Sequence, residues 1–263
     1  MPYYDAHLHL QLLPQLPGPE TLAEYRDAGI AKMVVNGSRE QDWEIVERLA
    51  KDPLVRPAYG LHPWHVANRS DTWYERLVDC LDRWTDALIG EIGIDKWIRT
   101  SSLKEQIPVF IKQLDLALER AIPPSIHCLQ SWGTLLEILR DRGPFPQGFL
   151  LHSYGGPAEM VEPFAQLGAY FSLSGYFARA DKAKKLEAFR VVPKERLLIE
   201  TDAPDMLPPP ELRMMEEIDK EGKPINHPLN LIRIYDWAAK LCGSESEAFQ
   251  QQIEENFQRL FGN

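Results

Sequence analysis

Short apolar runs alternate with longer amphipathic stretches along most of the chain. Eight runs are rich in leucine, β-branched and aromatic residues, and each predicts a buried strand. These predicted strands are Tyr3–Leu8, Lys32–Asn36, Val55–Leu61, Leu88–Ile92, Pro124–His127, Phe149–His152, Tyr170–Leu173 and Leu197–Glu200. The stretches between them have helical periodicity and predict helices at Glu20–Ala28, Gln41–Ala50, Thr72–Trp84, Leu103–Arg120, Trp132–Arg142, Ala158–Leu167 and Lys182–Phe189. Two more helices are predicted between Leu229 and Phe261.

This alternation is typical of a parallel α/β sheet. Eight strands, each followed by a helical segment, favour a (β/α)8 TIM barrel, a fold that needs about 250 residues. The chain has 263 residues, so we expect a single barrel domain over residues 1–263. A doubly wound open sheet is the alternative. It usually has fewer strands, and no glycine-rich dinucleotide or P-loop pattern follows any predicted strand here.

One long loop, from Pro204 to Pro228, interrupts the alternation after the eighth predicted strand. In a barrel it would overhang the mouth. Long ordered loops in compact domains are often functional. The prolines at 208–210 and Pro224 equally fit a stiffened surface insertion, so both interpretations stay open.

Composition excludes several classes of protein. Hydrophobic residues make up 44% and charged residues 26%, the balance of a soluble globule rather than a disordered chain or a coiled coil. No apolar run approaches the roughly 18 residues that cross a bilayer, so we expect no membrane partner. Twenty-nine basic against 39 acidic residues give a net charge of −10, unsuited to non-specific nucleic-acid binding. A phosphate substrate would need local recognition, for example by bound metal.

The three cysteines, Cys80, Cys128 and Cys242, lie far apart and form no CxxC pair. They suggest neither a disulfide framework nor structural zinc. The opening residues lack the basic and apolar regions of a signal peptide. We therefore expect a protein of the reducing cytoplasm. We also expect it to be a monomer.

The candidate chemistry begins at the end of the first predicted strand, in Asp5-Ala6-His7-Leu8-His9. Residues two apart in a strand share a face, so the side chains of His7 and His9 can bind the same cation. An HxH pair alone is a moderate signal, because such a pair can also be structural.

Four further residues strengthen the case, since each ends or follows an apolar run. They are Glu91, His127, His152 and Asp202. The C-terminal ends of barrel strands form one ring around the active site. Carboxylates and imidazoles gathered there need a compensating cation or partners.

Six potential ligands are too many for one ion that keeps a position open for water or substrate. We expect two divalent ions bridged by Glu91, one bound by His7, His9 and Asp202 and the other by His127 and His152. Two ions about 3.5–4 Å apart can stabilise the attacking and leaving oxygens of a displacement at phosphorus and can activate water. Asp202 is then a candidate general base, which makes Asp202 and Glu91 the candidate catalytic residues.

These motifs resemble the TatD family of metal-dependent hydrolases, within the amidohydrolase-like barrel superfamily. The resemblance covers essentially the whole chain. It rests on six segments: Asp5-Ala6-His7-Leu8-His9, Gly60-Leu61-His62-Pro63, Gly90-Glu91-Ile92-Gly93-Ile94-Asp95, Ile126-His127, His152-Ser153-Tyr154 and Thr201-Asp202-Ala203-Pro204. It implies a DNase that depends on Mg²⁺, Mn²⁺ or Zn²⁺, 3′-5′ exonucleases among its relatives, and metal ligands at the same six positions. It also implies that His62 lies at the rim and faces substrate.

The chain departs from the family pattern at two places. The family usually has Arg two residues after the histidine of the fifth strand, where this chain has Leu129, and His227 stands where Glu is common. Arg is the side chain that would pair with a phosphate. The partner can therefore be DNA ends or a small phosphoester. Metal-dependent hydrolysis of a small amide or ester, and a non-catalytic metal-binding barrel, are the alternatives.

Other side chains at predicted strand ends are candidate substrate contacts. Trp64 and Trp97 could stack on a base or pack over the mouth. Ser174 could offer its hydroxyl to a phosphate or simply end a strand. Asp95 could orient a metal ligand or cap a helix. For each of these residues both interpretations stay open.

Overall fold

The structure is a computed structural model that describes residues 1–262. Eight parallel strands form one sheet in chain order, as expected of a (β/α)8 barrel. The strands are β1 (Tyr3–Leu8), β2 (Ile30–Asn36), β3 (Val55–Tyr59), β4 (Leu88–Asp95), β5 (Pro124–Leu129), β6 (Phe149–Leu151), β7 (Ala169–Ser174) and β8 (Leu197–Glu200). The barrel prediction is confirmed, and with it the single-domain α/β class.

The ring closes between the first and last strands. The Asp202 amide donates to the His7 carbonyl at 3.0 Å, and the His9 amide donates to the Ala203 carbonyl at 2.7 Å. Both pairs lie at the C-terminal ends of β1 and β8. Closure therefore brings two predicted ligand segments, about 195 residues apart in sequence, into direct contact at the mouth.

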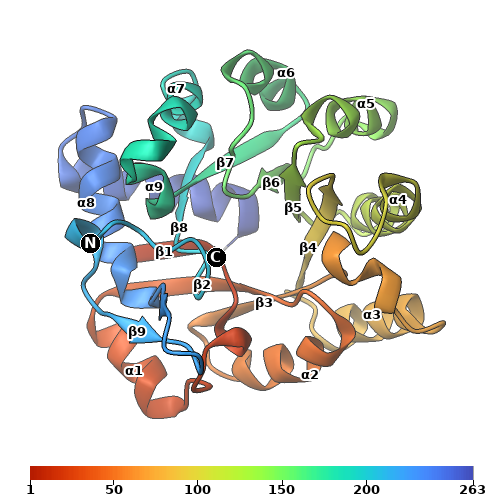
Figure 1. Cartoon of the computed structure of the whole chain (residues 1–263), viewed down its shortest axis with the longest axis horizontal. Helices are drawn as coiled ribbons and strands as arrows, with labels where there is room; N and C mark the ends of the chain where they lie inside the picture. The colour runs from red at the N-terminus through yellow and green to blue at the C-terminus, as the bar shows by residue number, and fades with distance from the viewer. Residues whose placement is uncertain (263) are drawn as a thin grey trace.

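Helices surround the strands (Figure 1). They are α1 (Pro19–Asp27), α2 (Glu40–Leu49), α3 (Trp73–Arg83), α4 (Leu103–Glu119), α5 (Trp132–Arg142), α6 (Val161–Gln166), α7 (Leu186–Phe189), α8 (Leu231–Leu241) and α9 (Ser246–Phe261). In α3 the residues at positions 73, 77, 80 and 81 are buried, at the spacing of one helical face. Burial of each large apolar side chain stabilises the folded state by about 1.5–3 kcal/mol relative to its exposure. No helix in residues 1–262 combines the length and the apolarity that a membrane span requires.

The predicted helix Lys182–Phe189 is α-helical only in its second half. Residues Ala180–Lys185 form a 3₁₀ helix, and only Leu186–Phe189 are α-helical. The 3₁₀ segment buries none of its residues, so no apolar face stabilises a full α-helix there. The predicted helix Ala158–Leu167 likewise begins with a 3₁₀ turn, and its α-helical part starts at Val161, which leaves Pro163 in the first turn where proline is tolerated.

The long loop after β8 contains a small antiparallel ribbon, β9 (Glu217–Ile218) paired with β10 (Pro224–Ile225). Asn226 fastens the end of this loop to the barrel, because its side-chain amide donates to the Thr201 carbonyl at 2.7 Å. In Figure 1 the β9 segment is drawn between β2 and α1. The loop is thus ordered and lies beside the mouth.

Gly93 permits the close approach of β4 and β5. Its φ is +152°, and a Cβ there would lie 2.0 Å from the His127 carbonyl oxygen. We expect Gly93→Ala to lower the free energy of unfolding by about 3 kcal/mol or more, measured by urea denaturation. Gly133→Ala is the matched control, because its Cβ would meet nothing within 4 Å and alanine favours the helix. Equal stability of the two variants would contradict the packing argument.

Candidate metal centre

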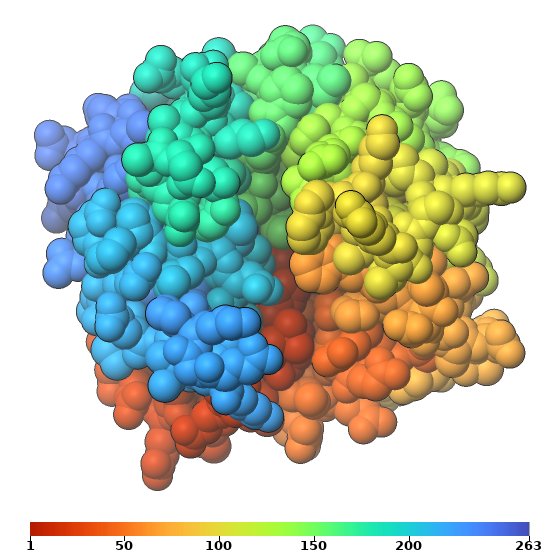
Figure 2. Space-filling view, in the orientation of Figure 1, coloured from red at the N-terminus to blue at the C-terminus, as the bar shows by residue number. Residues whose placement is uncertain are grey.

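The six predicted ligands converge at the C-terminal mouth of the barrel. Three of them lie inside strands, namely His7 in β1, Glu91 in β4 and His127 in β5. The other three follow strand ends: His9 after β1, His152 after β6 and Asp202 after β8. Figure 2 shows a hollow at the centre of this face, between the loop that follows β8 (blue) and the segment after β4 (yellow). N-terminal residues, in red, are visible at its bottom.

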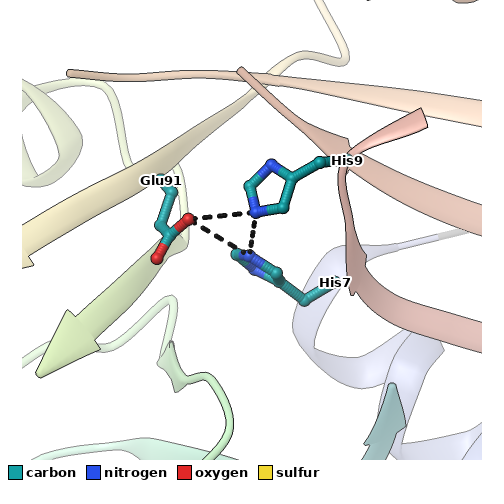
Figure 3. Close-up of side chains that lie close together, drawn as sticks. All are labelled: His7, His9 and Glu91. Carbon is teal, nitrogen blue, oxygen red and sulfur yellow. Dashed lines mark hydrogen bonds and ion pairs between the residues drawn. The ribbon is translucent and has the colours of Figure 1, made fainter. Parts of the chain in front are cut away.

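Glu91 lies at the centre of the cluster, and its two oxygens face different sets of imidazoles. Oε2 is 3.2 Å from His9 Nε2 and 3.4 Å from His7 Nε2 (Figure 3). Oε1 is 2.8 Å from His152 Nε2 and 3.1 Å from His127 Nδ1. A carboxylate that bridges two cations needs this division of its oxygens between two groups of ligands.

The first group comprises His7, His9 and Asp202. Asp202 Oδ1 lies 3.5 Å from His9 Nε2 and 3.7 Å from His7 Nε2. His9 Nδ1 is 2.7 Å from the Asn36 carbonyl, which only accepts, so Nδ1 carries the proton of the neutral ring. His7 Nδ1 is held by the Ser125 hydroxyl at 2.8 Å. The Nε2 lone pair of His9 therefore faces the two carboxylates, as a metal ligand requires.

The second group comprises His127 and His152. His127 Nε2 lies 3.1 Å from Asp95 Oδ2, so the proton sits on Nε2 and Nδ1 faces Glu91. His152 Nδ1 faces Glu200 Oε1 across 3.8 Å. Neither of these two atoms has a hydrogen-bond partner among the residues described. His152 Nε2, the other ring nitrogen, points at Glu91.

His62 also contacts Glu91, with Nε2 3.2 Å from Oε1. His62, Glu91 and His127 offer atoms that lie within 4.8 Å of one another, close enough for a third metal group. However, His62 Nδ1 accepts the Trp64 amide at 3.2 Å, which leaves the proton of the neutral ring on Nε2. His62 is therefore better placed to donate a hydrogen bond than to bind a cation.

Burial and mutual contact shift the protonation of the cluster. Burial lowers the pKa of His62 to about 4, and burial together with His152 holds the pKa of His7 well below its usual value. Burial also opposes charge on His9, yet Glu91 raises the pKa of His9 to about 9. Burial would raise the pKa of Glu91, but His62 and His152 more than offset it and hold that pKa well below its usual value.

Asp202 shows the opposite balance. Burial raises the pKa of its carboxyl well above the usual value, although His152 and His9 oppose the shift. For His152, burial is outweighed by Glu91 and Glu200, which raise the pKa well above its usual value. Protons on His9, His152 and Asp202 thus offset part of the negative charge at the centre. Divalent cations can replace these protons, because metal ligands bind in their deprotonated forms.

The predicted substrate contacts differ in position. Trp64 is 40% exposed at the rim, and its indole N–H donates to Asp95 Oδ2 at 2.7 Å. Ser174 is fully buried, and its hydroxyl accepts the Tyr176 amide at 3.3 Å. In this arrangement Ser174 caps the 3₁₀ turn that follows β7, so its hydroxyl is not presented at the mouth. Leu129, which stands where the family usually has Arg, is 38% exposed at the end of β5.

Sequence reasoning missed a layer of polar side chains beneath the ligands. Ser125 holds His7, and Glu200 faces His152. Asp5 accepts hydrogen bonds from Thr201 at 3.0 and 2.6 Å and so links β1 to the end of β8. Each of the three lies two residues before a predicted ligand, on the same strand face. That spacing is the signal that could have identified them.

Comparison with known proteins agrees with this architecture. The 3′-5′ ssDNA/RNA exonuclease TatD of Erwinia billingiae is 29% identical over 248 residues, 90% of this chain and 89% of that protein. The uncharacterized metal-dependent hydrolase YjjV of Escherichia coli is 28% identical over 265 residues, covering 98% and 97% of the two chains.

Two solved structures share the fold. The crystal structure of YjjV from Escherichia coli matches with a TM-score of 0.85 at 24% identity, over 99% of this chain and 98% of that one. A TatD family hydrolase from Entamoeba histolytica matches with a TM-score of 0.81 at 18% identity, over 100% and 99%. The family model described as TatD related DNase matches residues 4–262. The chain therefore belongs to the TatD family of metal-dependent hydrolases.

Proposed function

We propose that this protein is a two-metal phosphodiesterase that removes nucleotides from the 3′ end of a single-stranded nucleic acid. The observation that carries the proposal is the position of Glu91, whose Oε2 faces His7 and His9 and whose Oε1 faces His127 and His152. The name of the relative from Erwinia billingiae, a 3′-5′ ssDNA/RNA exonuclease, supports the choice of substrate.

The residues present fit two divalent ions, Mg²⁺, Mn²⁺ or Zn²⁺. His7, His9 and Asp202 would hold one ion, and His127 and His152 would hold the other, with Glu91 shared between them. Imidazole and carboxylate ligands suit all three metals to different degrees. When bound, such ions polarise a phosphoryl oxygen and lower the pKa of water.

The protein's own groups have distinct roles in this proposal. The Asp202 carboxylate accepts the proton of the attacking water, for which it must be deprotonated, and nearby positive charge favours that form. His62 Nε2–H, which donates to Glu91 here, turns to a phosphate oxygen at the rim. The low pKa of His62, about 4, keeps the ring a neutral donor near neutral pH.

Ser125 orients a ligand without facing the metal. We expect Ser125→Ala to weaken divalent-metal affinity by about 10–100-fold, because loss of the hydroxyl frees the His7 ring to rotate. Equilibrium dialysis against Mn²⁺ measures the effect. Ser131→Ala is the matched control, since the Ser131 hydroxyl is buried on the next loop and has no partner among the described residues. Unchanged affinity in Ser125→Ala would refute the orienting role.

Cleavage of a 5′-labelled single-stranded oligonucleotide with Mg²⁺ or Mn²⁺ tests the function directly. A 3′-5′ exonuclease gives a ladder of stepwise shorter labelled products, and chelation by EDTA abolishes the ladder. A circular single strand is the matched substrate control, because it has no 3′ end and should remain intact. The same assay with RNA tests whether both sugars are accepted.

Two outcomes would overturn the proposal. Absence of shortening in protein shown to contain metal would exclude the nuclease. Metal-dependent turnover confined to small esters or amides would assign the centre to that chemistry instead.

A further inference from the structure

Three large apolar side chains are exposed together beside the candidate metal centre. Trp64 is 40% exposed, Trp97 59% and Leu129 38%. The two indole rings have centroids 6.5 Å apart and planes tilted by 42°. The Lys96 amide donates to the Leu129 carbonyl at 3.0 Å, so Leu129 lies next to the segment that carries Trp97. We call Trp64, Trp97 and Leu129 the rim platform.

Asp95 ties the rim platform to the centre. Oδ2 of this fully buried carboxylate accepts the Trp64 indole N–H at 2.7 Å and lies 3.1 Å from His127 Nε2. Its Oδ1 accepts the Trp97 amide at 2.7 Å. Hydrogen bonds from both tryptophans and from His127 hold the pKa of Asp95 at about 2, although burial opposes this. One carboxylate thus positions both tryptophans and a candidate metal ligand.

Aromatic rings continue from the rim platform to the centre. The Trp64 ring contacts the His62 ring edge-on at a centroid distance of 5.2 Å, and His62 contacts His127 at 4.5 Å. A flat group resting on the rim platform would therefore be adjacent to the imidazoles that face Glu91. Core packing does not account for Trp97, because more than half of its surface is open to solvent.

Resting on the proposed function, we propose that Trp64 and Trp97 form a stacking subsite for an unpaired nucleobase next to the scissile phosphate. In a duplex both faces of a base are occupied by neighbouring bases, so only a single-stranded or frayed end can enter. Stacking uses the face that every base has and does not read the 2′-hydroxyl. The subsite therefore takes DNA and RNA strands of any sequence.

The charge of the chain makes this mode of binding useful. A net charge of −10 opposes general attraction of a polyanion. Stacking contributes affinity without basic side chains, and the hydrogen bond from Trp64 to Asp95 fixes one ring before substrate arrives. Binding of a single strand should then depend only weakly on salt.

Mononucleotide binding tests the subsite apart from turnover, because a mononucleotide has no diester to cleave. The probes are adenosine 5′-monophosphate and ribose 5-phosphate, titrated into the metal-loaded protein by calorimetry. We expect the nucleotide to bind at least about tenfold more tightly than the base-free sugar phosphate, the fold-change that one stacked base provides. It should also quench tryptophan fluorescence.

Variants of Trp97, the more exposed of the two tryptophans, test whether its ring binds the base. Trp97→Ala should weaken nucleotide binding about tenfold, and should raise KM for an oligonucleotide while kcat changes little. Trp97→Phe should retain most of the affinity, because it keeps an aromatic face. Trp84→Ala is the matched control, since Trp84 is a half-buried residue at the C-terminal end of α3.

The outcomes separate the subsite from the nuclease. Equal affinity for the two probes, or unchanged nucleotide affinity in Trp97→Ala, would overturn the subsite even if oligonucleotides are cleaved. Failure to cleave any oligonucleotide, with nucleotide binding that depends on Trp97, would overturn the proposed function and leave the subsite in place.

Discussion

Glu91→Gln is expected to lower kcat for oligonucleotide cleavage by about 10²–10³-fold or more and to reduce the content of bound metal. The carboxylate of Glu91 lies within 3.4 Å of five imidazoles, those of His7, His9, His62, His127 and His152. Breaking a buried charged network costs about 3–5 kcal/mol of stability, and a loss of about 3–4 kcal/mol of transition-state stabilisation lowers the rate by about 10²–10³-fold. Steady-state kinetics and elemental analysis of the dialysed protein measure the two effects.

The physical reason lies in the amide. Glutamine has nearly the same shape but keeps only one acceptor oxygen, so it can face one group of ligands and not both. The amide also carries no charge to balance the imidazoles. The cluster then loses the contact that raises the pKa of His9 to about 9, and with it the electrostatic attraction for a second cation.

Glu40→Gln is the matched control for this variant. Glu40 is a buried carboxylate outside the centre, where it accepts hydrogen bonds from Ser70 and Arg76. We expect the control to lose stability but to retain metal and turnover per folded molecule. If Glu91→Gln kept its full metal content and at least a tenth of the activity, Glu91 would not be the bridging group.

The eight strands could be predicted because a barrel strand is buried on both faces and reads as a short apolar run. Their ends do not follow from the apolar runs alone. The predicted fourth strand stops at Ile92, whereas β4 continues to Asp95. Gly93 and Asp95 depart from the apolar pattern there, since one is needed for close strand packing and the other for contacts at the rim.

The six candidate ligands could be predicted for the same reason, because each follows or ends an apolar run. Their assignment to two ions also follows from the sequence, but the ring nitrogen that each histidine turns toward Glu91 does not, since it depends on which nitrogen carries the proton. That proton is fixed by acceptors from other strands, the Asn36 carbonyl for His9 and the Asp95 carboxylate for His127. A single sequence does not show which strand supplies such a partner.

The role of Ser174 illustrates a different limit. The sequence predicts that this residue ends a strand, and Ser174 is the last residue of β7. Whether its hydroxyl faces substrate depends on the next turn, where the Tyr176 amide takes it as an acceptor. Serine commonly bonds nearby backbone in this way, so a polar strand end carries little information about ligand contact.

Asp202→Asn is expected to lower kcat by about 10²–10⁴-fold while the protein remains folded, the range for loss of a general base. The backbone supports this substitution. Asp202 has a φ of +57°, and asparagine tolerates the same left-handed conformation. The amide of residue 202 also keeps its hydrogen bond to the His7 carbonyl, which helps to close the barrel. Circular dichroism and thermal unfolding verify the fold.

Metal content distinguishes this variant from Glu91→Gln. His7, His9 and Glu91 remain in place, so Asp202→Asn should lose less metal than activity, whereas Glu91→Gln should lose both. Glu211→Gln is the matched control, because it removes one carboxylate charge from an exposed position on the same loop. Near-normal turnover in Glu211→Gln is expected. If Asp202→Asn were also active at full metal content, the proton would be accepted elsewhere, and Asp202 would not be the general base.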